Sequence, residues 1–230
     1  MKKSILGYFT RAELGLWLAS VAIILGAFLI FDGEGYLSLI ASLLGATSLI
    51  FIAKGNPIGQ VIIIVFCTLY AIISFSYAYY GELLTYLCMT LPMAVVSLIF
   101  WLKNPYKDSF AEVKVNRISK REICFALLLT GIVTTVFYFL LAYFNTANLV
   151  PSTLSVATSF FAAYLTFRRS PYYALAYAAN DIVLIVLWAL ATGEDISYIS
   201  VLACFVVFLF NDIYGFYSWR KMQKRQNAGA

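Results

Sequence analysis

Long apolar runs, separated by charged residues, glycine or proline, occupy most of the chain. Each run is close to the ~20 residues that a helix needs to cross a hydrocarbon layer. The connections between the runs are short except for residues 102–122, which the pattern indicates as the one sizeable loop. We therefore predict an all-α polytopic membrane protein, with eight spanning helices at residues 14–31, 36–53, 58–80, 83–101, 123–143, 151–167, 172–191 and 198–217.

The composition agrees with a membrane protein. Of the 230 residues, 63% are hydrophobic and 12% are charged, and the mean hydropathy is +0.87. A soluble domain typically carries about 25% charged and 45–50% apolar residues. A soluble globular protein is therefore excluded, and the spans leave no room for a separate nucleotide-binding or catalytic domain. We expect the net charge of +5 to reflect cytoplasmic loops and not a nucleic acid partner.

The basic residues all fall on one side of such a chain. If the eight spans start inside, the inner segments 1–13, 54–57, 102–122, 168–171 and 218–230 hold all 16 Lys and Arg residues. The outer turns hold only acidic charges. A Lys and Arg bias in short loops sets the orientation of a membrane protein, so we predict that both termini are cytoplasmic. The first span is too long for a secretory signal and lacks a small-residue cleavage site, which predicts a retained helix.

Landmarks recur in the same order in the two halves of the chain. The inner basic turns 54–57 and 168–171 both end in proline, and Trp101 and Trp219 each precede a basic residue at the end of a third helix. This pattern predicts two parallel three-helix repeats joined by an inverting linker helix, plus one extra N-terminal helix. The predicted divisions are an N-terminal segment and helix (1–35), the first repeat (36–101), the cytoplasmic loop and linker helix (102–148), the second repeat (149–219) and a basic cytoplasmic tail (220–230).

Two ionisable residues fall inside the predicted spans. They are Asp181 and Asp212, and each follows an asparagine. Inserting such a side chain costs about 2.5–3.5 kcal/mol, so it marks a candidate functional site. Asp181 lies ten residues after Pro171, which places it about 15 Å into the seventh span and therefore near the midplane. Asp212 lies in the inner half of the eighth span.

Helical spacing places aromatic side chains beside Asp181. Tyr177 lies one turn before Asp181 and Trp188 two turns after it. Aromatic rings together with an amide and a carboxylate suit a flat, polar, cationic ligand. The alternative is that these groups only pack against or bond to neighbouring helices. The predicted substrate-binding residues are Tyr173, Tyr177, Asn180, Asp181, Trp188, Asn211, Asp212 and, on the third span, Thr68.

Other kinds of site find little support. Histidine is absent, which excludes histidine bases, Ser-His-Asp triads and histidine metal ligands. The four cysteines are isolated and lack metal-binding spacing. We therefore predict no catalytic residues, no metal and no cofactor. Two alternatives remain open: an intramembrane aspartyl enzyme, and a scaffold or substrate-binding subunit of a larger complex.

Two stretches resemble a known family. Residues 169–188 (RSPYYALAYAANDIVLIVLW) and 211–219 (NDIYGFYSW) resemble the second-repeat signature of the PnuC family of bacterial nicotinamide riboside transporters. That family is similar in architecture to the sugar-transporting SWEETs. Some members carry Trp four and seven positions before the residue that corresponds to Asn180, where this chain has Ala176 and Tyr173.

The resemblance implies facilitated diffusion of nicotinamide riboside through a homotrimer in the bacterial inner membrane, with trapping by cytoplasmic phosphorylation. On this reading Asn180 and Asp181 hold the polar groups of the ligand, Tyr177 and Trp188 stack on its ring, and Asn211 adds a hydrogen bond. Related transporters that carry thiamine or riboflavin leave the vitamin open. Coupling to protons through Asp181 also stays open.

Overall fold

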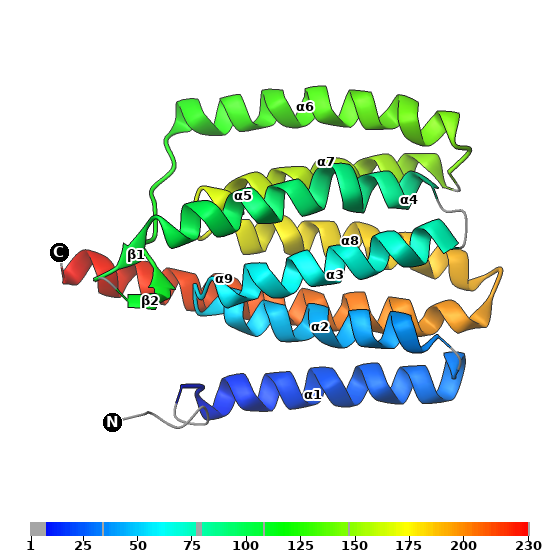
Figure 1. Cartoon of the computed structure of the whole chain (residues 1–230), viewed down its shortest axis with the longest axis horizontal. Helices are drawn as coiled ribbons and strands as arrows, with labels where there is room; N and C mark the ends of the chain where they lie inside the picture. The colour runs from blue at the N-terminus through cyan, green and yellow to red at the C-terminus, as the bar shows by residue number, and fades with distance from the viewer. Residues whose placement is uncertain (1–7, 34, 77–79, 108, 147, 230) are drawn as a thin grey trace.

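The bundle consists of eight membrane-length helical segments that run up and down along one axis (Figure 1). It is seen in a computed structural model that describes residues 8–33, 35–76, 80–107, 109–146 and 148–229. Within these residues the eight apolar spans confirm the predicted number, and the chain begins and ends at the same end of the bundle. The spans are Arg11–Asp32, Tyr36–Ala53, Ile58–Phe75, Thr85–Leu102, Lys120–Tyr143, Leu149–Phe167, Tyr173–Thr192 and Ile196–Ala228.

Local signals in the sequence account for several helix ends. Thr10 and Glu13 form a reciprocal capping box at the first helix, and Pro92 follows a π-helical segment in the fourth span. In chain order the elements are α1 (Arg11–Ala27), η2 (Phe28–Asp32), α2 (Tyr36–Ala53), α3 (Ile58–Ser76), α4 (Tyr80–Leu84), η3 (Thr85–Thr90), α5 (Leu91–Leu102), β1 (Pro105–Tyr106), β2 (Ser109–Val113), α6 (Lys120–Tyr143), α7 (Leu149–Phe167), α8 (Tyr173–Thr192), η4 (Ile196–Tyr198) and α9 (Ile199–Ala228).

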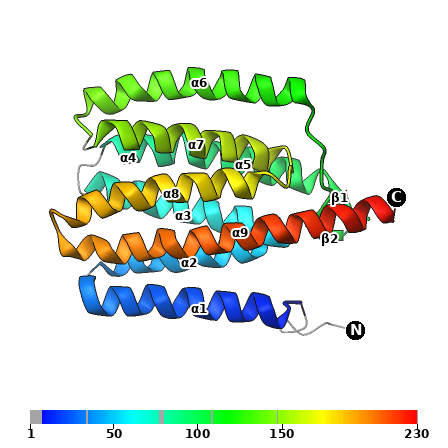
Figure 2. The same cartoon turned by 180° about the vertical axis from the view of Figure 1, so that it is seen from behind.

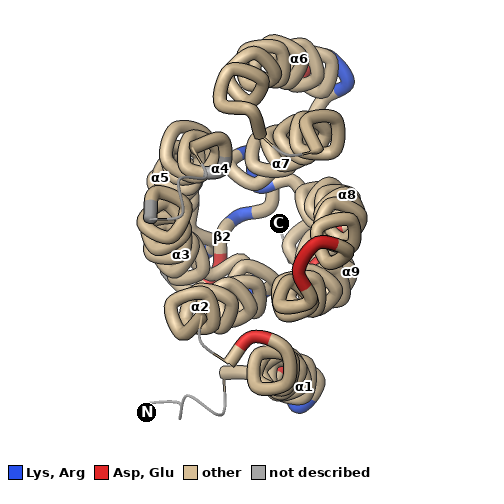
Figure 3. Tube along the Cα trace, turned by 90° about the vertical axis from the view of Figure 1, so that its right-hand side faces the viewer, with Lys and Arg blue, Asp and Glu red and all other residues tan. Residues whose placement is uncertain are grey.

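Six of these helices form a ring. Each packs on the next in the order α2, α3, α5, α7, α8, α9, and α9 closes the ring by packing on α2. The ring is seen end-on in Figure 3, with α1 outside it against α2 and α9, and α6 outside it against α7. Figure 2 shows α8 and α9 side by side on the opposite face of the bundle. The ring surrounds the site described below.

The two basic turns that open α3 and α8 have the same backbone structure. Gly55 (φ 66°) and Arg169 (φ 57°) both adopt the left-handed conformation, two residues before a proline. The Gly55 amide donates to the Ile52 carbonyl (2.8 Å), and the Arg169 amide donates to the Thr166 carbonyl (2.9 Å). Such a left-handed residue ends a helix by satisfying its last carbonyls. In the turn before α8, Arg169 therefore adopts the left-handed conformation that glycine usually adopts.

Two buried tryptophans join the turns across the ring. The indole N–H of Trp101, at the end of α5, donates to the Thr166 carbonyl (2.9 Å). The indole N–H of Trp219, on α9, donates to the Ile52 carbonyl (2.8 Å). The two rings lie against each other with their centroids 5.4 Å apart. Each predicted three-helix unit thus donates a tryptophan hydrogen bond to the first helix of the other unit.

The segment 102–122, which the sequence indicated only as a loop, contains a small antiparallel hairpin. Strands β1 and β2 form it, and Val113 at its end is fully buried in the cluster around Trp101 and Trp219. The Val113 amide donates to the Gly55 carbonyl (2.9 Å), and the Asn116 amide donates to the Arg169 carbonyl (3.0 Å). The segment therefore crosses the end of the ring that carries the basic turns 54–57 and 168–171, and it contacts both turns. We call this end the basic end.

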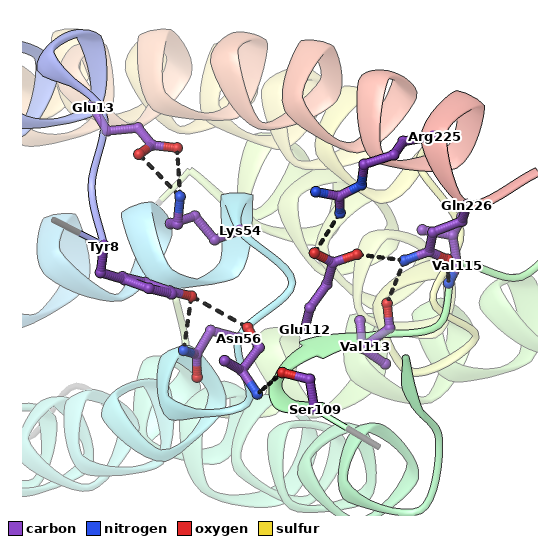
Figure 4. A network of polar contacts seen from close by, with 11 residues as sticks. Tyr8, Glu13, Lys54, Asn56, Ser109, Glu112, Val113, Val115, Arg225 and Gln226 are labelled. Carbon is purple, nitrogen blue, oxygen red and sulfur yellow. Dashed lines mark hydrogen bonds and ion pairs between the residues drawn. The ribbon is translucent and has the colours of Figure 1, made fainter. Parts of the chain in front are cut away.

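Helix α9 extends beyond the bundle and holds this hairpin. The predicted tail after residue 219 is helical as far as Ala228, and Gln226 is buried against β2 (Figure 4). The Gln226 side chain accepts from the Val115 amide (2.8 Å) and donates to the Val113 carbonyl (3.0 Å) and to Glu112 (2.7 Å). Arg225 adds an ion pair to Glu112.

Tyr8 attaches the chain before α1 to the same hairpin. Its hydroxyl donates to the Ala111 carbonyl (3.2 Å) and accepts from the Asn56 amide (3.0 Å). Burial raises the pKa of the Tyr8 hydroxyl, so it remains a hydrogen-bond donor at neutral pH. The hairpin therefore has contacts with α9, with the turn before α3 and with the start of the described chain.

Replacing Gln226 by Leu should loosen this hairpin. The change leaves a buried amide and a buried carbonyl without their partner, which costs about 1–3 kcal/mol. We expect amide hydrogen exchange at Val113 and Val115 to become at least about tenfold faster. The matched control is Gln223→Leu, one turn earlier on α9, because Gln223 contacts Arg220 and not the hairpin. Equal exchange rates in both variants would contradict the role given to Gln226.

Candidate binding cavity

The ring encloses a cavity of about 180 Å³. All six ring helices line it, so its walls come from both predicted three-helix units. The surface of the cavity is mostly apolar, and its polar groups come from several helices, with α7 and α8 contributing the most and both carboxyl groups lying on α8 and α9. The polar and aromatic residues that line it are Gln60, Phe66, Tyr70, Thr85, Tyr86, Thr90, Ser97, Thr146, Ser152, Ser155, Ser159, Thr166, Tyr173, Tyr177, Asn180, Asp181, Trp188, Phe205, Phe208 and Asp212.

Asn180 sits midway along α8 with its amide held in place. The Thr158 hydroxyl on α7 donates to the Asn180 side-chain carbonyl (2.8 Å). Because that oxygen is engaged, the NH₂ group of Asn180 is the part of the amide that remains to donate to a ligand. Asn180 is itself buried and lines the cavity. Thr158 therefore orients a hydrogen-bond donor in the wall.

Asp181 and Asp212 bring two carboxyl groups together in the same wall. Each of the two residues is only 3% exposed, and both line the same cavity. Among the residues that the structure describes, no Lys or Arg lines the cavity. The site is therefore acidic and, in the described part of the chain, has no positive charge of its own. Within those residues no group of three or more acidic or cysteine side chains could hold a metal ion.

Three aromatic residues of α8 line the cavity along its length: Tyr173, Tyr177 and Trp188. The Tyr173 ring is buried at the basic end, 5.0 Å from Trp219, and lies 6.3 Å from the Tyr177 ring. Trp188 lies near the other end, 5.3 Å from Tyr198. The structure thus places the predicted aromatic stripe of α8 on the cavity wall.

An aromatic cluster on α3 and η3 also lines the cavity. The rings of Phe66 and Tyr70 are 4.7 Å apart, and Tyr70 and Tyr86 are 4.9 Å apart. Tyr86 was not among the predicted residues, nor were Thr85 and Ser97. Nothing in their local sequence separates them from packing residues, since they carry no charge and lie in an apolar span. Phe66 and Tyr70 are one helical turn apart, and this spacing is the local signal by which this wall could be found from the sequence.

Two predicted residues lie away from the cavity. Asn211 points toward α1, where its NH₂ group donates to the Ser20 hydroxyl (2.9 Å) and to the Val207 carbonyl (2.8 Å). Thr68 is on the exposed side of α3 and donates to the Ile64 carbonyl of its own helix (2.8 Å). Both were predicted to face the ligand. In the structure α9 and α3 are rotated so that neither side chain lines the cavity.

The comparisons with known proteins agree on the class of this molecule. A curated relative, the nicotinamide riboside transporter PnuC of Neisseria mucosa, is 25% identical over 233 residues, which cover 99% of this chain and 88% of the relative. The solved crystal structure of the vitamin B3 transporter PnuC has the same fold, with a TM-score of 0.81 and 24% identity over 96% of this chain and 95% of that one. The family model described as nicotinamide mononucleotide transporter matches residues 35–221. This chain, a multi-pass membrane protein, therefore belongs to the nicotinamide mononucleotide transporter family.

Proposed function

We propose that this protein carries nicotinamide riboside across the membrane through the ring of six helices. The name of the Neisseria relative supports this substrate. The observation that carries the proposal is the cavity itself, which combines an oriented amide donor, two carboxyl groups and aromatic rings between the two halves of the bundle. Nicotinamide riboside is a flat cationic ring with a carboxamide and a ribose, and these groups match that wall.

The charge of the cavity favours the riboside over its phosphorylated form. A phosphate carries about −1.5 to −2 charges at neutral pH. Proteins usually bind it with Arg or Lys, and neither residue lines the cavity in the described part of the chain. Asp181 and Asp212 would repel a phosphate and attract the pyridinium cation. The substrate is therefore proposed to be the riboside, although the family description names the mononucleotide.

Individual residues receive roles from their positions. Asn180 donates to the carboxamide or ribose, and Asp181 and Asp212 compensate the ring charge. Tyr177 and Trp188 stack on the ring, and Tyr173 closes the basic end of the site. Asn211 and Thr68 are left out of the site because the structure places them elsewhere.

The transport mode is proposed to be facilitated diffusion by alternating access. The basic end of the bundle faces the cytoplasm, as the positions of Lys and Arg favour, and cytoplasmic phosphorylation traps the substrate. The reciprocal tryptophan contacts support the division into two three-helix repeats, and we propose that these repeats move against each other during transport. The resemblance noted above supports a homotrimer in the bacterial inner membrane. Uptake into liposomes that stops without a pH gradient would replace this uniport scheme with proton coupling.

Calorimetric titration of the purified protein tests the substrate. Nicotinamide riboside, nicotinamide mononucleotide, thiamine and riboflavin are titrated separately. We expect the riboside to bind, and the mononucleotide to bind at least about 100-fold more weakly because its phosphate meets two acidic side chains. Preferential binding of thiamine or riboflavin would keep the fold and change the vitamin. Equal binding of riboside and mononucleotide would contradict the charge argument.

A further inference from the structure

Two acidic side chains lie inside the ring without a basic partner in the described chain. Asp181 on α8 and Asp212 on α9 both line the cavity, and each residue is only 3% exposed. Two buried carboxyl groups in one cavity do not both ionise without compensation, because burial and the like charge both favour a proton on one of them. This geometry therefore favours a pair that holds one proton and carries one negative charge.

No neighbouring group in the described chain supplies a positive charge to this pair. Among the described residues that line the cavity, the other titratable side chains are Tyr70, Tyr86, Tyr173 and Tyr177. Helix α7 contributes hydroxyl groups to the cavity wall, and α2 contributes Gly45, Leu49 and Ile52. Lys54, near the basic end of α2, is engaged by Glu13. The pair therefore has only neutral neighbours among these groups.

One oxygen of the pair has no hydrogen-bond donor within the described chain. Oδ2 of Asp181 is buried, and no N–H or O–H group of the described chain donates to it. Leaving a buried carboxylate oxygen unpaired is costly, so such an atom in a cavity wall marks a position for a ligand charge or donor. A cation in the cavity would compensate it directly.

We propose that Asp181 and Asp212 share one proton and act together as a single negative charge that selects a cationic ring over its neutral, reduced form. This inference rests on the proposed function and adds a specificity to it. One shared charge neutralises one pyridinium charge, so the loaded site is electrically neutral in a water-poor environment. Two ionised carboxylates would leave an excess charge, and two protonated ones would leave the cation unpaired. Asp212 is thus a specificity residue that acts with Asp181.

The test compares two ligands that differ by one hydride. Nicotinamide riboside and its 1,4-dihydro form have nearly the same shape, but only the first is a cation. In calorimetric titrations of the intact protein at pH 7, we expect the cation to bind at least about tenfold more tightly. We also expect binding of the cation to release much less than one proton, measured from titrations in buffers of different ionisation enthalpy. Release of a full proton would mean that the empty pair holds two protons, and would overturn the proposal.

Substitutions of Asp181 and Asp212 distinguish one negative charge shared by the pair from two independent negative charges. In Asp181→Asn and in Asp212→Asn the new NH₂ group replaces the protonated carboxyl as donor, so one charge remains and the tenfold preference should persist. In the double variant the preference should fall to about one, while the dihydro form still binds. Asp195→Asn is the matched control, since Asp195 is exposed and lies in the turn before η4.

The possible outcomes are distinct. Loss of the preference in one single Asn variant that still binds the dihydro form would overturn the shared charge. Equal binding of both ligands by the unmodified protein would overturn the selection by charge, and this result does not depend on whether the variants fold. Failure of the unmodified protein to bind either form would instead contradict the proposed substrate.

Discussion

Replacing Asn180 by Ala should weaken the binding of nicotinamide riboside by about 5- to 150-fold. This range corresponds to the 1–3 kcal/mol that an unpaired buried polar group costs. The Ala side chain removes the oriented NH₂ donor and leaves a polar group of the ligand without a partner. It also removes one acceptor of the Thr158 hydroxyl, which has the Leu154 and Ser155 carbonyls as its other acceptors. Calorimetric titration of the purified variant with the riboside measures the loss.

Two controls define this result. Thr158→Val keeps Asn180 but removes the hydroxyl that orients it, so we expect a smaller loss of about tenfold or less. Thr68→Val should leave the affinity unchanged, because Thr68 faces outward and bonds to its own helix. An Asn180→Ala variant that is folded and binds the riboside normally would remove Asn180 from the proposed site. A strong effect of Thr68→Val would contradict the orientation of α3.

Replacing Lys54 by Met should destabilise the folded protein by about 3 kcal/mol, in the range measured for breaking a buried ion pair. The Lys54 ammonium lies 3.1 and 3.2 Å from the two carboxylate oxygens of Glu13 (Figure 4). The Glu13 side chain is 4% exposed and that of Lys54 is 18% exposed. The Met side chain leaves the Glu13 carboxylate buried without its cation. Loss of the contact between Lys54 and the Tyr8 ring (4.7 Å) adds to the effect.

Denaturation in detergent, followed by tryptophan fluorescence, compares this variant with two others. In Glu13→Gln/Lys54→Met both charges are absent, so most of the lost stability should return. Arg225→Met breaks a pair whose arginine is 60% exposed, and it should cost less than about 1 kcal/mol. A cost for Lys54→Met as small as that of Arg225→Met would show that the Glu13 carboxylate reaches water.

The Glu13 pair also shows where reading the sequence is incomplete. Only Asp181 and Asp212 were predicted as ionisable residues within spans, because the first span was expected to begin at residue 14. Helix α1 begins at Arg11, and its capping box buries Glu13 against Lys54 and Tyr214. A shift of three residues at a helix end is a common uncertainty of sequence patterns. Here the earlier start of α1 places Glu13 within the helix, where its carboxylate is buried and paired with Lys54.

Sequence patterns alone predict the number of spans, their approximate ends and the residues of α8 that share one face of the helix. These follow from local rules. A helix needs about 20 apolar residues to cross the membrane, and side chains three, four and seven positions apart share one face. The aromatic residues and Asn180-Asp181 lie on one such face, so their common position needed no knowledge of other helices. The tertiary structure places that face toward the cavity.

Which residues of the other helices face inward depends on how those helices pack together. Asn211 and Asp212 are adjacent in α9, and successive residues of a helix point about 100° apart. Because α9 packs on α1 as well as on α2 and α8, Asn211 bonds to Ser20 outside the ring while Asp212 lines the cavity together with Asp181. The hairpin at the basic end and the reciprocal bonds of Trp101 and Trp219 likewise join segments far apart in the chain. Such contacts depend on how the helices are rotated and packed, which local periodicity does not specify.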